Sequence, residues 1–348
     1  MANKPVTIRD VAGELGVSYT TVSRAISGSA GVGEETRQKI LETCERMGYT
    51  TNYMARALAG KKTRLLGLLL GTINNPYMSL IAAIVEKQAR SKGYHLLLSN
   101  SMNNLEQEME CFTLLIGRQV DGIILVPALS TSFSKLEKYI SQIPTLFLGD
   151  NLRDSRVSYV AVDNYQGAHI GCSHLISLGH RNILYLGRRP GSTTHKLRGE
   201  GYRDACQEAD ITPQFMDNTV SPSSSIEDGY RLGLSLFSKP FKYTAIFAAA
   251  DSIALGVMRA ADESRVTIPG DISLLGFDNI SYSNLPRINL TTVSQPIETM
   301  AKTAVDLLIE KIENPSTGYA HRVLSPALIE RSTCSSIIDP ATVGGRKK

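Results

Sequence analysis

The chain has 348 residues, of which 42% are hydrophobic and 20% are charged, and it contains no tryptophan. This composition is ordinary for a soluble globular protein of two or three domains, and it excludes the membrane, collagenous and disordered classes. The formal net charge of +4 belongs entirely to residues 1–64, which hold ten Lys or Arg and six Asp or Glu. A small basic head on a neutral body suggests a polyanionic partner such as nucleic acid, and a solvated basic surface is an equal alternative at this point.

The amino-terminal residues and the cysteines indicate the compartment. The first ten residues are polar and lack the apolar core of a signal peptide, and no apolar run reaches the ~18 residues of a membrane helix. The five cysteines lie far apart without a CxxC pair, which disfavours a disulfide framework and a zinc site. We therefore expect a cytoplasmic protein with no membrane contact, no metal and no cofactor.

Three short helices are predicted in the basic head. Thr7 stands three residues before an acid, which is typical of a capped helix start, and apolar residues repeat at helical spacing as far as Gly16. A second helix starts after Ser18, and a third is expected over residues 34–47. Two short helices joined by a tight turn and supported by a third form a helix-turn-helix unit, which we place in residues 1–50.

The second helix presents a polar start. Ser18, Tyr19, Thr20 and Thr21 cluster there, and Arg24 follows one turn later. Hydroxyls at a helix start suit phosphate contact through the free amides, and the side chains suit base-edge contact in the major groove. The alternatives are that Ser18 only caps the helix, that Tyr19 covers a neighbouring helix, and that Arg24 is solvated.

The segment TIRDVAGELGVSYTTVSRAISG, followed by TRQKI and GYxxNxxARAL, resembles the head of the LacI/GalR family of bacterial transcription regulators. The resemblance continues to about residue 333. It implies a homodimer that binds a palindromic operator in double-stranded DNA, with a hinge helix and linker in residues 51–64 that fold on the operator. It implies phosphate contacts at Thr7, Ser18, Thr21, Ser23, Thr36 and Asn52. It implies contacts to base edges in the major groove at Tyr19, Thr20 and Arg24. It implies minor-groove contacts of the hinge at Ala55 and Leu58.

Leu58 would act as the apolar wedge that kinks the central base step. Two positions depart from the family pattern. Thr51 stands where proline is usual, and Gly33 replaces the usual serine cap of the third helix. Each departure should slightly loosen the end of the helix at which it stands, and neither removes a base contact.

The body alternates apolar runs with helical patterns. Strands are expected at 65–71, 94–100, 122–127, 145–150, 182–188, 245–250 and 272–278, and helices at 77–92, 105–118, 133–142, 197–209, 226–238 and 251–263. This alternation predicts an α/β body of two lobes, each a doubly wound parallel sheet, and it resembles periplasmic sugar-binding proteins.

We place an effector-binding and dimerisation domain in residues 65–335 and a tail in residues 336–348. The amino-terminal lobe is expected to comprise residues 65–162 and 293–320. The carboxyl-terminal lobe is expected to comprise residues 163–292 and 321–335.

Polar residues follow the predicted strands, at the sheet edge where small molecules bind in such folds. They are Asn75, Tyr77, Asp150, Asp163, Asp251 and Asp278. Carboxylates and amides suit a polyhydroxylated ligand, because each oxygen can accept hydrogen bonds from adjacent hydroxyls. The alternative is that the Asp residues cap the following helices, and for Asp251 capping is at least equally supported.

The family resemblance adds further effector contacts. It implies that Asp278 and Arg198 are the most regular ones and that Tyr77 and Thr194 also line the cleft. Ser224 stands where many members carry an aromatic residue that stacks on the effector. Arg188 and Arg189 would favour an anionic effector such as a sugar phosphate, although a solvated loop is the stronger interpretation.

Three functions compete. An enzyme is disfavoured because the chain has no nucleophile elbow, zinc-protease motif or Walker loop. Its six histidines show no metal spacing, and we expect most of them at the surface or at helix caps. A solute-binding protein of sugar transport would fit the body, but the basic head and the missing export signal oppose it. The sequence therefore predicts a DNA-binding regulator, most simply a repressor, controlled by a sugar or sugar derivative. A dimer is expected, because the tail lacks leucine heptads.

Overall fold

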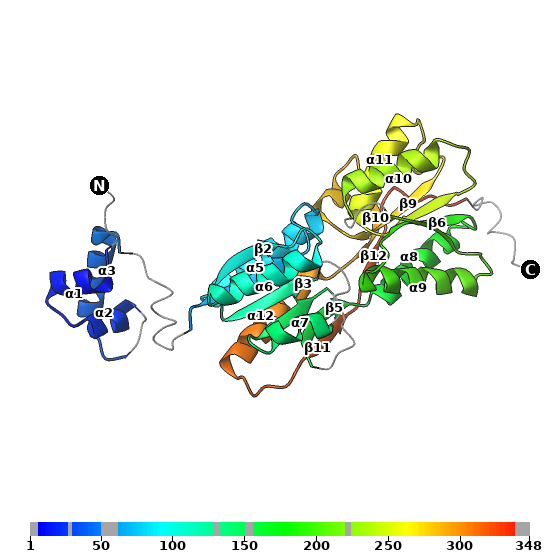
Figure 1. Ribbon diagram of the computed structural model, residues 1–348. Coiled ribbons are helices and arrows are strands. Elements are labelled where there is room, and N and C mark those ends of the chain that lie inside the picture. Colours follow the sequence, from blue (N-terminus) through cyan, green and yellow to red (C-terminus); the bar gives the residue numbers. More distant parts are fainter. Residues whose placement is uncertain are drawn as a thin grey trace, which may run out of the picture. The chain divides into compact units, whose positions relative to one another are not determined.

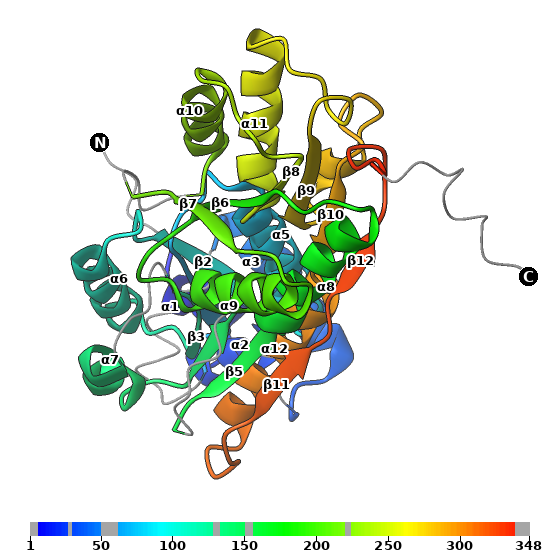
Figure 2. The same cartoon turned by 90° about the vertical axis from the view of Figure 1, so that its right-hand side faces the viewer.

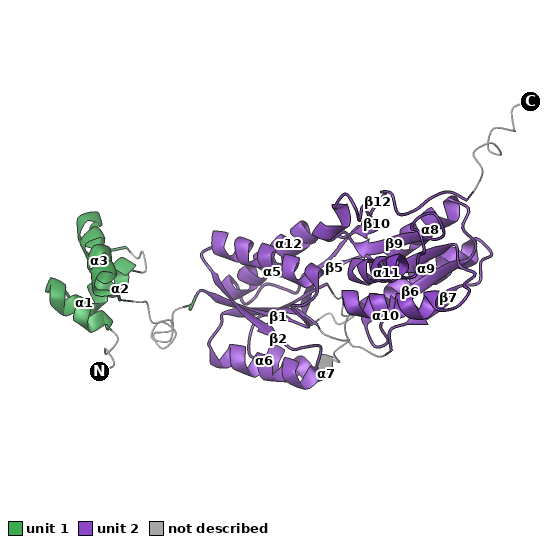
Figure 3. Ribbon diagram, turned by 90° about the horizontal axis from the view of Figure 1, so that it is seen from above, with its two compact units in different colours: residues 1–63 green, residues 64–348 purple. Residues whose placement is uncertain are grey.

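The structure, a computed structural model, describes residues 6–26, 30–49, 62–127, 133–149, 156–219 and 224–337 (Figure 1). The chain divides into two compact units, residues 1–63 and 64–348 (Figure 3). Each unit has its own hydrophobic core. Within the described part of the chain, no helix is both long and apolar enough to cross a bilayer.

The first unit consists of three helices, α1 (Ile8–Leu15), α2 (Tyr19–Ile26) and α3 (Glu34–Met47). Thr7 and Asp10 form a capping box at the start of α1, and Gly16 ends this helix in the left-handed conformation at φ 63°. The predicted helices and caps are therefore confirmed. Gly33 provides no side-chain hydrogen bond at the start of α3, as its lack of a side chain requires.

The core of the first unit is small. Val11, Val22 and Ile40, one from each helix, are almost fully buried where the helices meet. So few buried side chains leave little stability in reserve, because each contributes roughly 1.5–3 kcal/mol.

The first lobe of the second unit is built on a six-stranded sheet in the order β11-β5-β4-β3-β1-β2. Its strands, all parallel, are β1 (Leu65–Leu70), β2 (His95–Asn100), β3 (Gly122–Val126), β4 (Thr145–Leu148), β5 (Ser158–Val162) and β11 (His321–Leu324). Helices cover both faces, α5 (Pro76–Ser91) and α12 (Ile297–Glu313) on one side, and α6 (Leu105–Gly117) and α7 (Phe133–Ile140) on the other (Figure 3).

The second lobe repeats this plan with the strand order β12-β10-β9-β8-β6-β7. Its strands are β6 (Ile183–Arg188), β7 (Gln214–Asp217), β8 (Ala245–Ala248), β9 (Ser273–Asp278), β10 (Thr291–Ser294) and β12 (Ala327–Ile329). One face carries α8 (Asn164–Ser177) and α9 (Thr193–Glu208), and the other carries α10 (Ile226–Phe237) and α11 (Asp251–Glu263) (Figure 2). A short 3-10 helix, η1 (Ser281–Asn284), follows β9.

The two predicted doubly wound sheets are confirmed, with β12 adding the one antiparallel pair among the described strands. Two predicted lobe boundaries are early. β10 lies entirely in the second sheet and β11 pairs with β5 in the first, so the chain crosses after residue 294 and again between residues 324 and 327, not at 293 and 320. The short strands β5, β7, β10, β11 and β12 and the helices α8 and α12 were not predicted individually.

The connections between the lobes leave from the carboxyl ends of β5, β10 and β11. Both sheets therefore direct the carboxyl ends of their parallel strands toward the crossing segments. In folds of this kind, ligands bind beside the carboxyl ends of the strands.

Replacing Ile40 by alanine should unfold much of the first unit. The lost side chain is 1% exposed, and such truncations cost about 2–5 kcal/mol. Hydrogen exchange of the full chain, followed by mass spectrometry, should show lost protection over α1, α2 and α3 with the second unit unchanged. Leu41→Ala removes a side chain that is 43% exposed and should leave protection intact. Equal effects of the two substitutions would contradict this core.

Candidate functional site

A cleft that encloses a cavity of about 90 Å³ and is partly open to solvent is lined by residues of both lobes. Its walls come from the carboxyl ends of the strands and from the first turns of α5 and α9. Six of the predicted effector contacts line it, namely Asn75, Tyr77, Thr194, Arg198, Ser224 and Asp278. Asp150 lies outside the described residues.

A buried ion pair lies in the cleft wall. Arg198 and Asp278 are 6% and 4% exposed, and Nη2 of the guanidinium lies 3.4 Å from Oδ1 of the carboxylate. Arg198 also donates from Nε to Asn164 Oδ1 at 2.8 Å and from Nη1 to the Ala249 carbonyl at 2.7 Å. Its guanidinium carbon lies 3.6 Å from the centre of the Phe277 ring. The arginine is thus held by four groups, as a desolvated cation requires.

The network extends from this pair to the first lobe. Gln295 donates from Nε2 to Asp278 Oδ1 at 2.7 Å, and the Tyr77 hydroxyl donates to Gln295 Oε1 at 3.0 Å. Burial raises the pKa values of Asp278 and Tyr77, and the positive charge of Arg198 opposes both increases. Tyr77 therefore stays a neutral hydrogen-bond donor at neutral pH.

A second bridge joins the lobes. Asn75 caps α5, since its Oδ1 accepts a hydrogen bond from the Tyr77 amide at 2.9 Å. Its Nδ2 donates to the Ser224 carbonyl of the second lobe at 3.4 Å. Two predicted effector contacts thus meet each other across the cleft.

Asp278 occupies a strained backbone position. Its φ is 125° and that of Asn279 is 56°, so two consecutive residues that are not glycine lie in the left-handed region. Such conformations cost about 1–3 kcal/mol each and persist where the surroundings hold them. Here the carboxylate is held by Arg198 and Gln295.

His195 is a cleft residue that the sequence prediction missed. Most histidines were expected at the surface or at helix caps, but His195 is 6% exposed and lines the cleft. Its Nδ1 accepts a hydrogen bond from the Arg189 amide at 3.2 Å, so its proton resides on Nε2, 3.5 Å from Ser224 Oγ. Burial, with nearby arginines, lowers the pKa of His195 well below its usual value. The ring therefore offers the cleft a neutral N–H donor.

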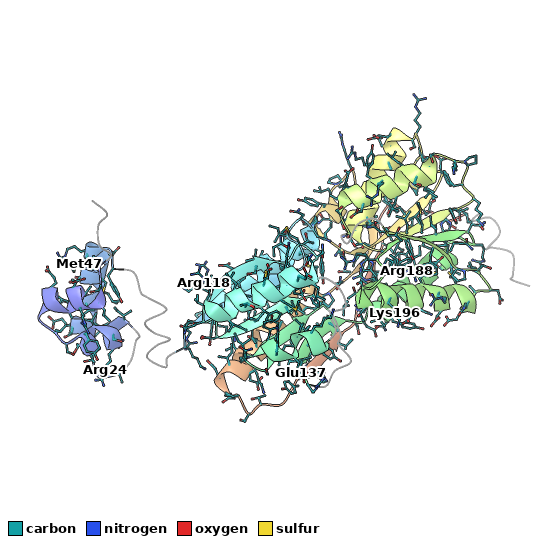
Figure 4. The ribbon with its side chains drawn as sticks, viewed as in Figure 1. Arg24, Met47, Arg118, Glu137, Arg188 and Lys196 are labelled. Carbon is teal, nitrogen blue, oxygen red and sulfur yellow. The ribbon has the colours of Figure 1, made fainter. Side chains whose placement is uncertain are left out.

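The two adjacent arginines differ in their surroundings. Arg188 is labelled in Figure 4. It donates from Nε and Nη2 to both oxygens of Asp217 at 2.8 Å and stacks on Phe215, so its interpretation as a solvated loop residue is wrong. Arg189 lines the cleft. Burial and the charge of Arg198 lower the pKa of Arg189 to about 10, which leaves it positively charged at neutral pH.

Two predicted effector contacts do not line the cleft. Asp163 caps α8, accepting a hydrogen bond from the Gln166 amide at 2.9 Å, as its alternative interpretation predicts. The cap of α11 is Ala250, so the capping prediction for Asp251 is wrong by one residue. The fully buried Asp251 carboxylate instead accepts hydrogen bonds from the Ile280 amide and from the Ser283 and Thr292 hydroxyls. Both carboxylates thus hold secondary structure, and neither aspartate lines the cleft.

The polar start of α2 is accessible. Ser18 Oγ accepts a hydrogen bond from the Thr21 amide and lies 2.6 Å from Thr20 Oγ1 and 2.9 Å from Thr21 Oγ1. Tyr19 is 58% exposed, so the alternative that it covers a neighbouring helix is wrong. The side chain of Arg24 projects from α2 (Figure 4).

The other predicted DNA contacts can be placed in part. Thr7 and Thr36 are exposed, and Ser23 is half-buried. Asn52, Ala55 and Leu58 lie outside the described residues.

Comparison with known proteins identifies the family. Residues 7–52 match the family described as bacterial regulatory proteins, lacI family, and residues 172–334 match a periplasmic binding protein-like domain. Catabolite control protein A of Priestia megaterium is 33% identical over 324 residues, which cover 91% of this chain and 97% of that protein. The chain belongs to the lacI family.

Solved structures of lacI-family proteins extend the comparison. The lac repressor dimer bound to operator and the anti-inducer ONPF matches with a TM-score of 0.83 and 28% identity, covering 95% of this chain and 100% of that one. A periplasmic binding protein/LacI transcriptional regulator from Alkaliphilus metalliredigens QYMF, complexed with D-xylulofuranose, matches with a TM-score of 0.69 and 27% identity over 78% of this chain and all of that chain. The relatives are transcriptional regulators and not enzymes.

The buried, neutral state of His195 should make the stability of this lacI-family protein depend on pH. The pKa of His195 in the folded protein lies below its value of about 6.5 in the unfolded chain. The unfolded chain therefore takes up a proton first as the pH falls below about 6.5, and the folded state loses stability in that range. When the pH is lowered from 7.0 to 5.5, the free energy of unfolding should fall in both proteins. The decrease should be about 1 kcal/mol smaller in His195→Gln than in the wild type. Urea titrations at both pH values measure the difference.

Two comparisons control this measurement. Burial also lowers the pKa values of His174 and His180, but both rings are present in both proteins and their contributions cancel. His95→Gln changes an exposed histidine and should behave as the wild type. The same pH dependence in wild type and His195→Gln would refute a buried neutral ring.

Proposed function

We propose that this chain is a cytoplasmic transcriptional repressor that binds a palindromic operator as a homodimer. A sugar or sugar derivative in the cleft between the lobes controls the affinity for the operator. The observation that carries this proposal is the convergence of six predicted effector contacts, from separate parts of the chain, on one cleft. The lacI-family head supplies the DNA-binding half of the function.

We propose the DNA contacts on residues of the amino-terminal unit and of the segment that follows it. Tyr19, Thr20 and Arg24 are proposed to read base edges in the major groove. The phosphate contacts are assigned to Thr7, Ser18, Thr21, Ser23, Thr36 and Asn52. Ala55 and Leu58 are assigned to the minor groove, where an apolar side chain can wedge a base step apart.

The hydrogen bonds that join the lobes give the effector a means of control. A ligand in the cleft must compete with, or add to, the bonds that Tyr77 and Asn75 make to Gln295 and Ser224. It therefore has different contacts in different arrangements of the lobes, which is the condition for a conformational switch. A coupling of ~1–3 kcal/mol is typical of such regulators. The effector is an inducer or a corepressor according to the arrangement it prefers.

Neutral hydrogen-bonding groups support a sugar as the effector. Thr72, Asn75, Asn103, Thr194 and Ser224 line the cleft. Such groups suit a polyhydroxylated ring. The related regulator complexed with D-xylulofuranose supports this class of ligand.

Exposed apolar side chains support the homodimer. Leu98 and Met102 lie on or beside the edge strand β2, and Leu114 lies on α6. Tyr282 and Leu285 are exposed in the second lobe. Large apolar side chains left in water in both lobes fit a surface that a second copy covers, and the lac repressor to which the chain is similar is a dimer.

The proposed function predicts enrichment of a palindrome. Full-length protein should select, from a library of random duplexes at moderate salt, two inverted half-sites centred about one helical turn (~34 Å) apart. Adding the cognate sugar should change the affinity for the selected duplex by about fivefold or more, as a coupling of ~1 kcal/mol requires. The proposal would be overturned if no sequence were enriched over random DNA, either in the absence or in the presence of candidate sugars.

Thr20→Ala should change which base is preferred at one position of each half-site. A lost base contact is worth about 1–3 kcal/mol of discrimination, whereas a lost phosphate contact weakens binding to all sequences alike. Thr36→Ala, at a proposed phosphate contact, is the matched comparison. Affinities for the selected duplex and its single-base variants separate the two cases. A uniform loss with Thr20→Ala would make Thr20 a phosphate contact.

A further inference from the structure

We propose that Cys172 and Cys206 are a peroxide-sensitive pair that forms a disulfide between α8 and α9. Neither cysteine lines the cleft, so this modification site does not depend on the identity of the effector. The two cysteines are 34 residues apart in the sequence, and no local pattern predicts that they meet. In cytoplasmic proteins, disulfides are usually transient and serve redox sensing or catalysis.

The two thiols are in contact within the second lobe. Sγ of Cys172 lies 3.6 Å from Sγ of Cys206, and both side chains are completely buried. A disulfide bond is about 2.05 Å long, so the sulfur atoms need to approach by about 1.5 Å. Small rotations of the two side chains can supply this approach.

The packing of the two helices holds the sulfur atoms together. α8 and α9 lie side by side on one face of the second sheet (Figure 1, Figure 2). Gly201 makes their contact close, because a Cβ at this position would overlap the Tyr165 carbonyl group. The Tyr165 hydroxyl donates to Asp204 Oδ2 at 2.8 Å, and His169 Nε2 lies 2.9 Å from Glu208 Oε2. These contacts fix α9 against α8 along the length that carries the two cysteines.

The surroundings distinguish the two sulfur atoms. A hydrogen bond from Cys172 lowers the pKa of Cys206, burial raises it, and a hydrogen bond from Tyr202 lowers it further. The hydrogen bond with Cys206 and burial both raise the pKa of Cys172. Because the thiolate is the nucleophile, Cys206 is the sulfur that reacts first and Cys172 is the one that keeps its proton.

The reaction consumes one peroxide for each disulfide. The Cys206 thiolate attacks one oxygen of hydrogen peroxide and breaks the O–O bond, which gives a sulfenic acid and hydroxide. This hydroxide takes up the proton released from the Cys206 thiol and becomes water. Sγ of Cys172 then attacks the Cys206 sulfur, and the S–O bond breaks. The second hydroxide leaves as water with the proton of Cys172, so two thiols and one peroxide give one disulfide and two waters.

Burial restricts the class of oxidant. Both sulfur atoms lie in the core between the sheet and the helices α8 and α9. A bulky disulfide such as oxidised glutathione cannot reach either sulfur in the folded protein. Hydrogen peroxide is small and uncharged, and it can enter during local openings of the helix pair.

Peptide mapping tests the site in the full-length protein. The folded protein is treated with hydrogen peroxide, and the remaining thiols are alkylated after denaturation. Mass spectrometry should find a peptide in which Cys172 and Cys206 are linked, with a mass lower by two hydrogen atoms. Oxidised glutathione should not produce this link in the folded protein. Hydrogen exchange over α8 and α9 should be slower in the oxidised protein, because the bond ties the two helices together.

Three variants test the order of the steps. Cys172→Ser should stop the reaction at the sulfenic acid of Cys206, which dimedone traps, and Cys206→Ser should leave Cys172 as a thiol. Cys111→Ser is the matched control, because this partly exposed cysteine donates to the Asn100 carbonyl at 3.8 Å, and the link should still form. Thermal unfolding confirms that each variant is folded, and the mapping of the wild type needs no substitution.

The same experiments contain the results that would overturn the inference. Absence of the linked peptide from peroxide-treated wild type would refute the site. Equal linkage by oxidised glutathione would refute the restriction to a small oxidant, and a sulfenic acid on Cys172 in Cys206→Ser would refute the order of the steps. Unchanged hydrogen exchange in the linked protein would show that the bond does not tie α8 to α9.

Discussion

The buried ion pair between Arg198 and Asp278 is the constraint on which the cleft depends. Two charges taken out of water are tolerated only when both are paired and hydrogen-bonded, and loss of one partner leaves the other desolvated. Here the guanidinium is held by Asn164 and the Ala249 carbonyl as well as by the carboxylate. These partners come from α8, the end of β8 and the end of β9, so the pair fixes three elements of the second lobe relative to α9.

The position of the pair follows from the fold. Asp278 is the last residue of β9, and the strand ends in two consecutive left-handed residues that turn the chain away from the sheet. Directly behind it, the Asp251 carboxylate binds the Ile280 amide and the hydroxyls of Ser283 and Thr292. The turn after β9 is therefore secured by one aspartate that is fully buried, and this leaves the other free to face the cleft. Of two aspartates at adjacent strand ends, Asp251 thus has a structural role, and Asp278 has the binding role that we propose.

Local patterns predicted the elements well and the roles of single residues less well. The capping box at Thr7 and the stop at Gly16 were predictable because residues within one helical turn decide them. Asp163 and Asp251 follow the same pattern of strand, aspartate and helix, yet one caps and the other bridges distant segments. The partners of Asp251 lie about 30 to 40 residues away in sequence, at Ser283 and Thr292, so no local signal separates the two cases.

Two cleft residues, His195 and Gln295, were not predicted, and only the first could have been found from a local pattern. His195 stands three residues before Arg198, and residues at this spacing share a helix face, so its place was available from the periodicity of α9. Gln295 lies on a segment that crosses between the lobes, and only the tertiary fold brings it to Asp278. The short strands went unrecognised because they are brief. Exposure adds to this in β11, whose residues His321 to Val323 are all exposed, whereas β5 and β10 are mostly buried.

The interlobe bonds are of a suitable strength for a switch. A neutral hydrogen bond contributes about 0.5–1.5 kcal/mol net, so the bonds of Tyr77 to Gln295 and of Asn75 to Ser224 together approach the ~1–3 kcal/mol of a typical allosteric coupling. Breaking the Arg198–Asp278 pair would cost more, about 3–5 kcal/mol, and would leave a buried charge. An effector that exchanges the two neutral bonds for its own can therefore shift the lobes while the ion pair stays closed. In the proposed function the pair would therefore be the fixed part of the site, and Tyr77, Gln295 and Asn75 would convert ligand binding into a change in the lobes.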